Sequence, residues 1–293
     1  MATKNYAVSN KARLLNITRQ KEGLTFMQVL LRFIHERFLY RLSVSDYREH
    51  FFLKGGALLY AHVKFEARPT LDIDFMGERI SRDRGNIKQA FREICSIPCE
   101  ADGVKFDCGE DEVVVEDITL EREYNGIRVH MTAHLDTIVQ PISMDVGFGD
   151  VIIPEAVNLD YPLLLDDMPE VNVAAYSLET VVAEKFQTMI DRAENNSRMK
   201  DFFDVYHILH GERICPSLLE EAVCEVFANR GTEYQEHHPL FEHSFVDSNV
   251  RQAMWQTFLR KIKYKGTLGF DEVVSMITKV LKPIWDRMGE NLV

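Results

Sequence analysis

The sequence is poor in cysteine and contains no long apolar run, and both shortages restrict the class of protein. The five cysteines are odd in number and form no Cys-x-x-Cys pair, which favours reduced thiols over a disulfide framework or a structural zinc site. No uninterrupted apolar run approaches the length of a membrane span, and residues 1–16 lack the apolar stretch of a signal peptide. We therefore expect a cytoplasmic protein without a membrane segment.

Positive charge is also in deficit, with 34 Lys and Arg residues against 46 Asp and Glu residues and a formal net charge of −12. This balance argues against non-specific binding of nucleic acid, which depends on neutralising phosphates. Basic residues do cluster locally, at residues 32–48, 79–84 and 260–265. Each cluster is either a basic groove or a solvated face, and we favour the solvated face.

The periodicity of the remaining sequence predicts an α+β protein. A capping box at residues 25–28 opens an amphipathic helix that runs to about residue 42. Alternating apolar and polar residues predict strands over 112–148, with an Asn-Gly turn at 123–126. After a loop-rich connection at 154–169 the apolar spacing is helical to the end. We therefore expect an N-terminal domain of helices and an antiparallel-rich sheet over residues 1–153, packed against a mainly helical domain over 154–293.

A glycine pair and an Asp-x-Asp motif lie close together in the first domain. A short apolar strand over residues 51–54 ends at Gly55-Gly56, where we expect a helix to begin. Asp72 and Asp74 follow in a second strand, and because successive side chains of a strand point to opposite faces, the two carboxylates share one face. Carboxylate oxygens suit a hard cation such as magnesium, and the N–H groups of a glycine turn suit phosphate. The pattern indicates metal-assisted phosphoryl or nucleotidyl transfer.

Asp145 is a third carboxylate that the strand pattern places on the same side of the sheet. The apolar residues Ile142, Met144 and Val146 alternate along its strand, so Asp145 faces the other way. We expect a sheet with one apolar face and Asp145 on the carboxylate face.

A second group of charged residues lies in the helical half. Lys185 falls inside the apolar stripe of a helix over residues 178–192, and a lysine facing the core needs an anionic partner or a ligand. Taken alone, a snorkelling lysine or an internal ion pair is the favoured interpretation. Asp201 and Asp204 lie near one edge of a later helix, where they could cap its start, pair with Lys185 or Arg198, or orient a catalytic group. Capping and ion pairing are favoured for them.

Histidines offer weaker candidate metal sites. His130 and His134 share a strand face, and His237 and His238 lie near His243. We favour ordinary surface or partly buried histidines over metal ligands at these positions. No local motif indicates a Ser-His-Asp or Cys-His arrangement.

The glycine and Asp-x-Asp pattern, followed by the lysine and aspartate pattern, resembles the AbiEii/AbiGii toxin family of nucleotidyltransferases, the toxin components of AbiE-type abortive-infection systems. The similarity covers residues 37–75, which include LKGGALL and the Asp-x-Asp strand. It resumes at AEKFQTMIDRAENNSRMKDFFDVYHIL, which is similar to the family's later motif of a helical lysine followed by R-x-K-D-x-x-D. The strands between these segments and the last third of the chain match only in type.

The resemblance implies a polymerase-β-like nucleotidyltransferase fold that binds magnesium and a nucleoside triphosphate. It assigns metal binding to Asp72 and Asp74, with Asp145 as a third carboxylate. Lys185 would contact triphosphate oxygens as a positive point charge.

The resemblance also implies roles for the residues around these groups. Asp204 or Asp201 would orient the lysine or assist deprotonation of the attacking group. The family commonly has Ser or Thr after the glycine pair, and Ala57 here lacks that hydroxyl. Without this hydroxyl, a side-chain contact to phosphate is in doubt, but the backbone cradle is not. The phosphate side would be lined by Lys54, Gly55 and Gly56.

The activity that the resemblance implies is transfer of a nucleoside monophosphate to an acceptor hydroxyl, with RNA and in particular the 3′ end of tRNA as acceptor. The outcome would be growth arrest restrained by a cognate antitoxin, in defence against phage. One alternative is a binding protein on the same fold that does not turn over, against which the intact Asp72, Asp74 and Lys185 argue. The other is a small-molecule nucleotidyltransferase similar to antibiotic-modifying enzymes, which the later motif does not support.

Overall fold

The computed structural model describes residues 5–119, 125–211 and 214–290 and divides into two compact units. Unit 1 comprises residues 1–149 and 157–175, and unit 2 comprises residues 150–156 and 176–293. Within the described ranges, every helix is too short or too polar to cross a membrane.

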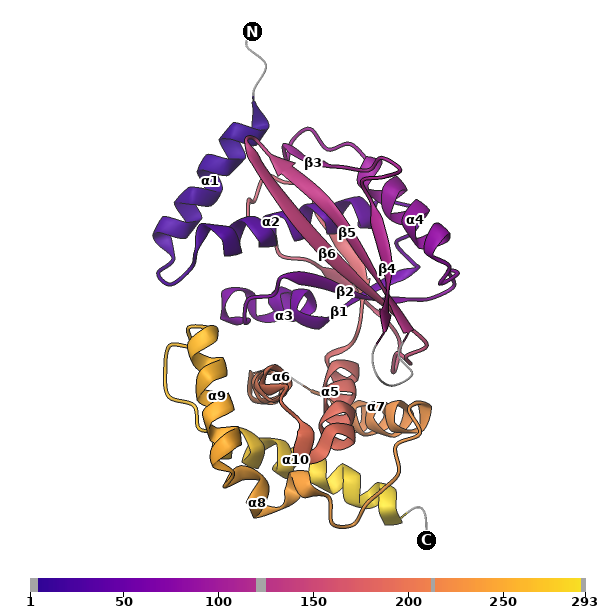
Figure 1. Ribbon diagram of the computed structural model, residues 1–293, viewed down its shortest axis with the longest axis vertical. Helices are drawn as coiled ribbons and strands as arrows, with labels where there is room; N and C mark the ends of the chain where they lie inside the picture. The colour runs from indigo at the N-terminus through magenta and orange to yellow at the C-terminus, as the bar shows by residue number, and fades with distance from the viewer. Residues whose placement is uncertain (1–4, 120–124, 212–213, 291–293) are drawn as a thin grey trace. The chain divides into compact units, whose positions relative to one another are not determined.

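Unit 1 contains one sheet and four α-helices among its described residues. Its eight strands run in the order β3-β5-β6-β2-β1-β8-β7, and β4 pairs with β5 beside β3 (Figure 1). The pairs β2–β6 and β1–β8 are parallel, and the other five pairs are antiparallel. The elements are α1 (Tyr6–Gln20), α2 (Phe26–Ser43), β1 (Phe51–Lys54), α3 (Gly55–Val63), β2 (Asp72–Gly77), α4 (Arg84–Ser96), β3 (Val104–Phe106), β4 (Val114–Thr119), β5 (Asn125–Leu135), β6 (Ile138–Phe148), β7 (Val157–Asp160) and β8 (Asn172–Ala175).

The strands β7 and β8 correct the expectation that the chain is loop-rich and then helical after residue 154. They pair with each other, and β8 pairs with β1, so residues 157–175 belong to the sheet of unit 1. Both strands have only four residues, too few for alternation to distinguish them from loop. The division of the structure therefore differs from the expected boundary between residues 153 and 154.

The antiparallel pair of β4 and β5 corrects a second detail. Asn125 pairs with Thr119 and Gly126 pairs with Ile118, so the Asn-Gly dipeptide lies in the ladder and not at the turn. The other two residues of the expected turn, 123 and 124, lie outside the described residues.

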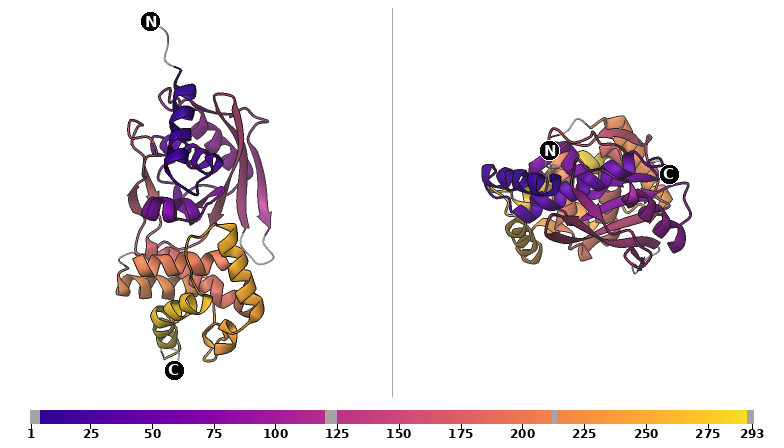
Figure 2. Two further views of the ribbon diagram at one scale, coloured as in Figure 1. Left: turned by 90° about the vertical axis from the view of Figure 1, so that its left-hand side faces the viewer. Right: turned by 90° about the horizontal axis from the view of Figure 1, so that it is seen from above.

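One face of the sheet is apolar and is covered by helices of the same unit. Phe38 of α2 contacts Phe75 of β2 and Phe91 of α4, with ring centroids 6.1 Å and 5.7 Å apart. The indigo helices lie on one side of the long magenta strands (Figure 2). Burial of each such side chain contributes roughly 1.5–3 kcal/mol. The polar residues of β2, β5 and β6 are therefore left on the opposite face.

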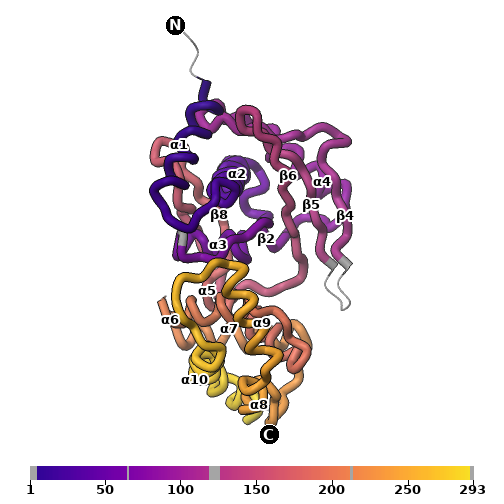
Figure 3. Tube along the Cα trace, turned by 60° about the vertical axis from the view of Figure 1, so that its left-hand side comes forward, coloured from indigo at the N-terminus to yellow at the C-terminus, as the bar shows by residue number. Residues whose placement is uncertain are grey.

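Unit 2 is helical over its described residues, and its helices pack through aromatic side chains. Phe186 and Phe227 join α5 to α7, and Phe202 and Phe270 join α6 to α10, with centroids 5.2 Å and 5.3 Å apart. Figure 3 traces the backbones of these four helices. The hydroxyl of Ser177 caps the start of α5. The helices are α5 (Leu178–Arg192), α6 (Met199–Gly211), α7 (Pro216–Asn229), α8 (His243–Val246), α9 (Asn249–Lys261) and α10 (Phe270–Glu290).

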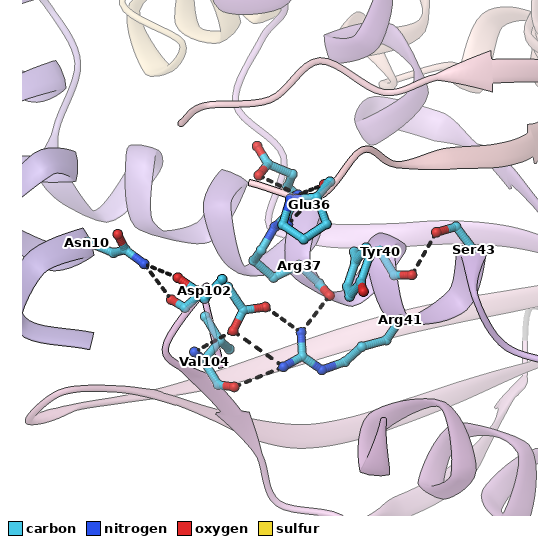
Figure 4. A network of polar contacts seen from close by, with 10 residues as sticks. Asn10, Glu36, Arg37, Tyr40, Arg41, Ser43, Asp102 and Val104 are labelled. Atoms are coloured by element: carbon cyan, nitrogen blue, oxygen red, sulfur yellow. Dashed lines mark hydrogen bonds and ion pairs between the residues drawn. The ribbon is translucent and has the colours of Figure 1, made fainter. Parts of the chain in front are cut away.

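The basic residues of α2 are buried, which corrects the expectation that residues 32–48 form a solvated face. Arg41 pairs with Asp102 at 2.8 Å and donates to the carbonyl of Val104 at 3.0 Å (Figure 4). Glu36 and Arg37, both buried, pair at 2.8 Å. These charges are paired inside unit 1, and Arg41 holds α2 to Asp102 and to the start of β3.

Candidate functional site

A row of charged residues crosses the polar face of the sheet in unit 1. Asp74 of β2 lies in register with Lys54 of β1 on one side and with Asp145 of β6 on the other. Asp145 is in register with Arg128 of β5, and Arg128 with Glu116 of β4. Side chains at paired positions share a face of the sheet, so five charged side chains from five strands lie in one row.

Asp72 belongs to a second, parallel row on the same face. It is in register with Ser143 of β6, which in turn pairs with His130 of β5. Asp72 and Asp74 are half-buried, whereas Ile73 and Phe75 between and after them are fully buried on the opposite face. The structure thus places Asp72, Asp74 and Asp145 on one face of neighbouring strands.

The glycine pair lies directly beside the Asp-x-Asp strand. Gly55 has a φ of +68°, which favours glycine, and a Cβ added there would overlap the carboxylate of Asp74. A Cβ on Gly56 would lie 2.7 Å from the Cβ of Thr70. Gly55 is the first residue of α3, where the backbone N–H groups of the first turn have no partner within the helix. The carboxylate of Asp74 therefore packs against the start of α3 because residue 55 has no side chain.

Arg128 was not predicted from the sequence as a site residue, and it forms a bidentate ion pair within the row. Its Nε donates to Oδ1 of Asp145 and its Nη2 to Oδ2, both at 2.7 Å. The hydrogen bond to Asp145 raises the pKa of Arg128, and the charges of Asp145, Asp72 and Glu116 add to this effect against desolvation. The guanidinium therefore lies in the field of two of the three predicted carboxylates.

Three of the five candidate histidines contact other side chains or the backbone. Nδ1 of His130 lies 3.0 Å from Oγ of Ser143, and its Nε2 lies 3.1 Å from Glu116. His134 lies 2.8 Å from Asp107. The buried His238 lies 3.0 Å from the carbonyl of Ile190. Across the described ranges, no three His, Cys, Asp or Glu side chains are grouped so that they could hold a metal ion by themselves.

Lys185 lies in a buried charge cluster of unit 2. Its Nζ is 2.7 Å from Oδ1 of Asp201 and 2.9 Å from Oδ2 of Asp204. The exposed fraction of the side chain is 13% for the lysine and 2% for each aspartate. The structure therefore shows the internal ion pair that was expected for a lysine in an apolar stripe.

Asp201 also accepts a hydrogen bond from Nε of Arg198 at 2.6 Å. Burial alone would raise the pKa of the Asp201 carboxyl, but the charges of Lys185 and Arg198 outweigh it and lower the pKa well below its usual value. Asp201 is therefore ionised at neutral pH although its side chain is almost completely buried.

The family model of the nucleotidyl transferase AbiEii toxin, of type IV toxin–antitoxin systems, matches residues 37–276. The chain belongs to the AbiEii family. The match includes the glycine pair, the Asp-x-Asp strand, Arg128, Asp145 and the Lys185 cluster. The resemblance found in the sequence is thereby confirmed, and the AbiEii chain is a nucleotidyltransferase of a toxin family with an α+β fold.

Two solved structures from Helicobacter pylori are similar to this AbiEii chain. JHP933 is 12% identical, with a TM-score of 0.48 over 92% of this chain and 96% of the other. A second protein, provisionally assigned as a nucleotidyltransferase, is 13% identical, with a TM-score of 0.41 over 83% of this chain and 100% of the other. None of the curated proteins matches the chain.

Proposed function

We propose that this AbiEii chain transfers a nucleoside monophosphate from a nucleoside triphosphate to an acceptor hydroxyl with the help of magnesium. The observation that carries the proposal is the position of Asp72 and Asp74 on one face of β2, beside the glycine start of α3. The row of charges across the sheet gives this face both carboxylates for a cation and basic groups for phosphates.

The residues fit a magnesium ion. Magnesium is commonly held by one or two carboxylates together with waters and substrate phosphates, so a pair of aspartates is sufficient. A cation bound there would organise the phosphates for in-line displacement and offset the charge of the leaving pyrophosphate.

The chain's own groups supply the rest of the proposed binding. Asp72 and Asp74 hold the cation. The backbone at Gly55 and Gly56 takes phosphate oxygens, because the first N–H groups of a helix have no partner inside the helix and lie at the positive end of its dipole. Lys54, the residue before α3, adds a positive charge in register with Asp74. Ala57 is buried and adds no hydroxyl.

For the cluster of unit 2 we propose the roles that the family resemblance implies. Lys185 contacts triphosphate oxygens, and Asp201 and Asp204 orient it. The support within unit 2 is that both carboxylates hold Nζ at less than 3 Å and that the lysine retains some exposure. The family resemblance also assigns Asp145 to the metal.

The proposed acceptor is RNA, with the 3′ end of tRNA favoured. We propose that the modification arrests growth, that a cognate antitoxin protein restrains it, and that the pair acts in the cytoplasm in defence against phage. Membership of a type IV toxin–antitoxin family supports the antitoxin partner.

The test is a transfer assay with each of the four α-labelled nucleoside triphosphates, magnesium, and total RNA, protein or small hydroxyl compounds as acceptors. We expect label on RNA with wild type, and a loss of about 1,000-fold or more in Asp74→Asn, because a metal clamp supplies several kcal/mol to the barrier. Asp111→Asn, on an exposed residue of the same unit, should retain full activity. Label on small compounds alone would favour an antibiotic-modifying type of enzyme, and no label on any acceptor would favour a binding protein.

A further inference from the structure

The ion pair between Arg128 and Asp145 gives both residues a more specific role in the proposed nucleotide site, and the inference rests on that proposed function. The pair is bidentate, with both contacts at 2.7 Å, so each carboxylate oxygen of Asp145 already accepts a strong hydrogen bond. Asp145 is more buried than Arg128, with exposed fractions of 22% and 37%. The geometry is that of a carboxylate that fixes a guanidinium, not of one left open for a metal.

The charges on the polar face of the sheet indicate what a guanidinium fixed in this way would do. Asp72, Asp74 and Asp145 place three negative charges on neighbouring strands, and a nucleoside triphosphate is itself an anion. A bound metal ion offsets only part of this repulsion, so the face needs fixed cations near the carboxylates. In the row of five residues, the cations are Lys54 at one side of Asp74 and Arg128 beyond Asp145.

Arg128 also has the reach and the donors for this task. Neighbouring strands lie about 4.8 Å apart, so the backbones of Asp74 and Arg128 are on the order of 10 Å apart, a span that the phosphate chain and an extended arginine can bridge. A guanidinium has more N–H donors than the two that it gives to Asp145. Its planar fork suits phosphate oxygens better than a point charge does.

We propose that Arg128 binds phosphate oxygens of the nucleoside triphosphate, and that Asp145 is the positioning residue that holds it rather than a ligand of the metal. Asp72 and Asp74 then form the whole protein contribution to the metal site. The proposal departs from the family-based assignment of Asp145 to the metal.

Two binding measurements on the full chain, without turnover, test this proposal. The first is the affinity for a non-hydrolysable α,β-imido nucleoside triphosphate in the presence of magnesium. Arg128→Gln should weaken it roughly tenfold, because a charge-assisted hydrogen bond is lost, and Arg128→Lys should restore only part of it. Arg84→Gln is the matched control, since Arg84 forms an exposed pair with Asp117 in the same unit and should leave the affinity unchanged.

The second measurement is the affinity for Mn²⁺ alone, followed by electron paramagnetic resonance. Asp145→Asn should stay within about twofold of wild type, whereas Asp72→Asn and Asp74→Asn should each lose about tenfold or more. Thermal melting of each variant checks that it is folded. Binding of an RNA acceptor should be unchanged in Arg128→Gln, and a loss there with full nucleotide affinity would assign Arg128 to acceptor phosphates and overturn the proposal.

The results that contradict the proposal are distinct from failure of the proposed function. If wild type binds the nucleotide and Arg128→Gln binds it equally well, or if Asp145→Asn loses Mn²⁺ as strongly as Asp74→Asn, the inference is wrong and the nucleotide site stands. If wild type binds neither nucleotide nor Mn²⁺, the proposed function fails and the inference fails with it.

Discussion

Two groups of aspartates and cations, one in each unit, use the same side chains in different surroundings. On the sheet of unit 1, Asp72 and Asp74 are half-buried on one face of β2, and Asp74 is in register with the half-buried Lys54 of β1. In unit 2, Asp201 and Asp204 are almost fully buried and enclose Lys185 at less than 3 Å. The first group is spread over the two neighbouring strands β1 and β2, whereas the second is concentrated around one ammonium.

The difference shows that the burial of a charged side chain decides whether it is available for ligand binding or is needed for the stability of the fold. A carboxylate that keeps access to water can exchange its partner for a ligand at modest cost. A carboxylate buried with a single cation cannot lose that cation without leaving an uncompensated charge. We therefore expect substitutions in unit 1 to affect ligand binding first and substitutions in unit 2 to affect folding first.

The largest effect on stability is expected from Lys185→Met. The substitution leaves the buried Asp201 and Asp204 without their common cation, which should lower the free energy of unfolding of unit 2 by about 3–5 kcal/mol. Both tryptophans, Trp255 and Trp285, are buried in unit 2, so urea unfolding followed by tryptophan fluorescence reports on this unit.

Lys279→Met is the matched control, because Lys279 is exposed on α10 of the same unit. It should shift the transition by less than about 0.5 kcal/mol. A similarly small shift for Lys185→Met would show that the two aspartates do not depend on the lysine, and the contrast between the units would fail.

A pH dependence of the same order is expected inside unit 1 from two neighbours on α2. Burial raises the pKa of Glu36 to about 7, against the opposing charge of Arg37, and burial lowers the pKa of His35 to about 4. Glu36 therefore contributes stability that is full below pH 4.5 and is lost as the pH rises through 7. His35 contributes stability that is full above pH 6.5 and is lost as the pH falls through 4. Each contribution is about 3 kcal/mol, and between pH 4.5 and 6.5 they oppose each other.

Single substitutions should separate the two contributions. In wild type the stability of unit 1 should change little between pH 4.5 and 6.5. In Glu36→Gln it should fall as the solution is made more acid, and in His35→Gln it should fall as the pH rises. Urea unfolding followed by far-ultraviolet circular dichroism measures the free energy of unfolding at each pH. The tryptophan fluorescence identifies the transition that belongs to unit 2. If the stability of unit 1 depended on pH in the same way in wild type and in both variants, the contributions assigned to Glu36 and His35 would be wrong.

The last comparison sets Gly55→Ala in the site against Gly231→Ala outside it, where the smaller effect on stability is expected. The positive φ alone costs an alanine about 1–2 kcal/mol, and Gly231 of unit 2, with a φ of +58° and no atom near the added Cβ, should show this cost by itself. At Gly55 the added Cβ also displaces the carboxylate of Asp74. Gly55→Ala should therefore weaken Mn²⁺ binding, and Gly231→Ala should not. Equal Mn²⁺ affinity in both variants would show that Gly55 is not part of the metal site.

Much of the local structure could be predicted because its causes are local. The capping box at Thr25 and Gln28 forms as expected, since its partners are three residues apart. The alternation in β2 and β6 correctly placed Asp72, Asp74 and Asp145 on the polar face. The spacing of the apolar stripe also showed that Lys185 needs a partner in the core.

The rest depends on register between strands that are far apart in the sequence. Nothing local to Arg128 shows that it lies opposite Asp145, because the pairing is set by how β5 and β6 align. The pairing of β8 with β1 could not be predicted for the same reason. The buried state of Arg41 follows from Asp102, a residue of another segment, and is not visible in the basic run of α2 itself.

Binding of Mn²⁺ tests the contrast between the two units most directly, with two aspartate pairs as matched variants. We predict that Asp72→Asn/Asp74→Asn loses at least about tenfold in Mn²⁺ affinity, whereas Asp201→Asn/Asp204→Asn, measured where it is folded, stays within about twofold of wild type. Loss of Mn²⁺ in the second pair, with retention in the first, would contradict the account.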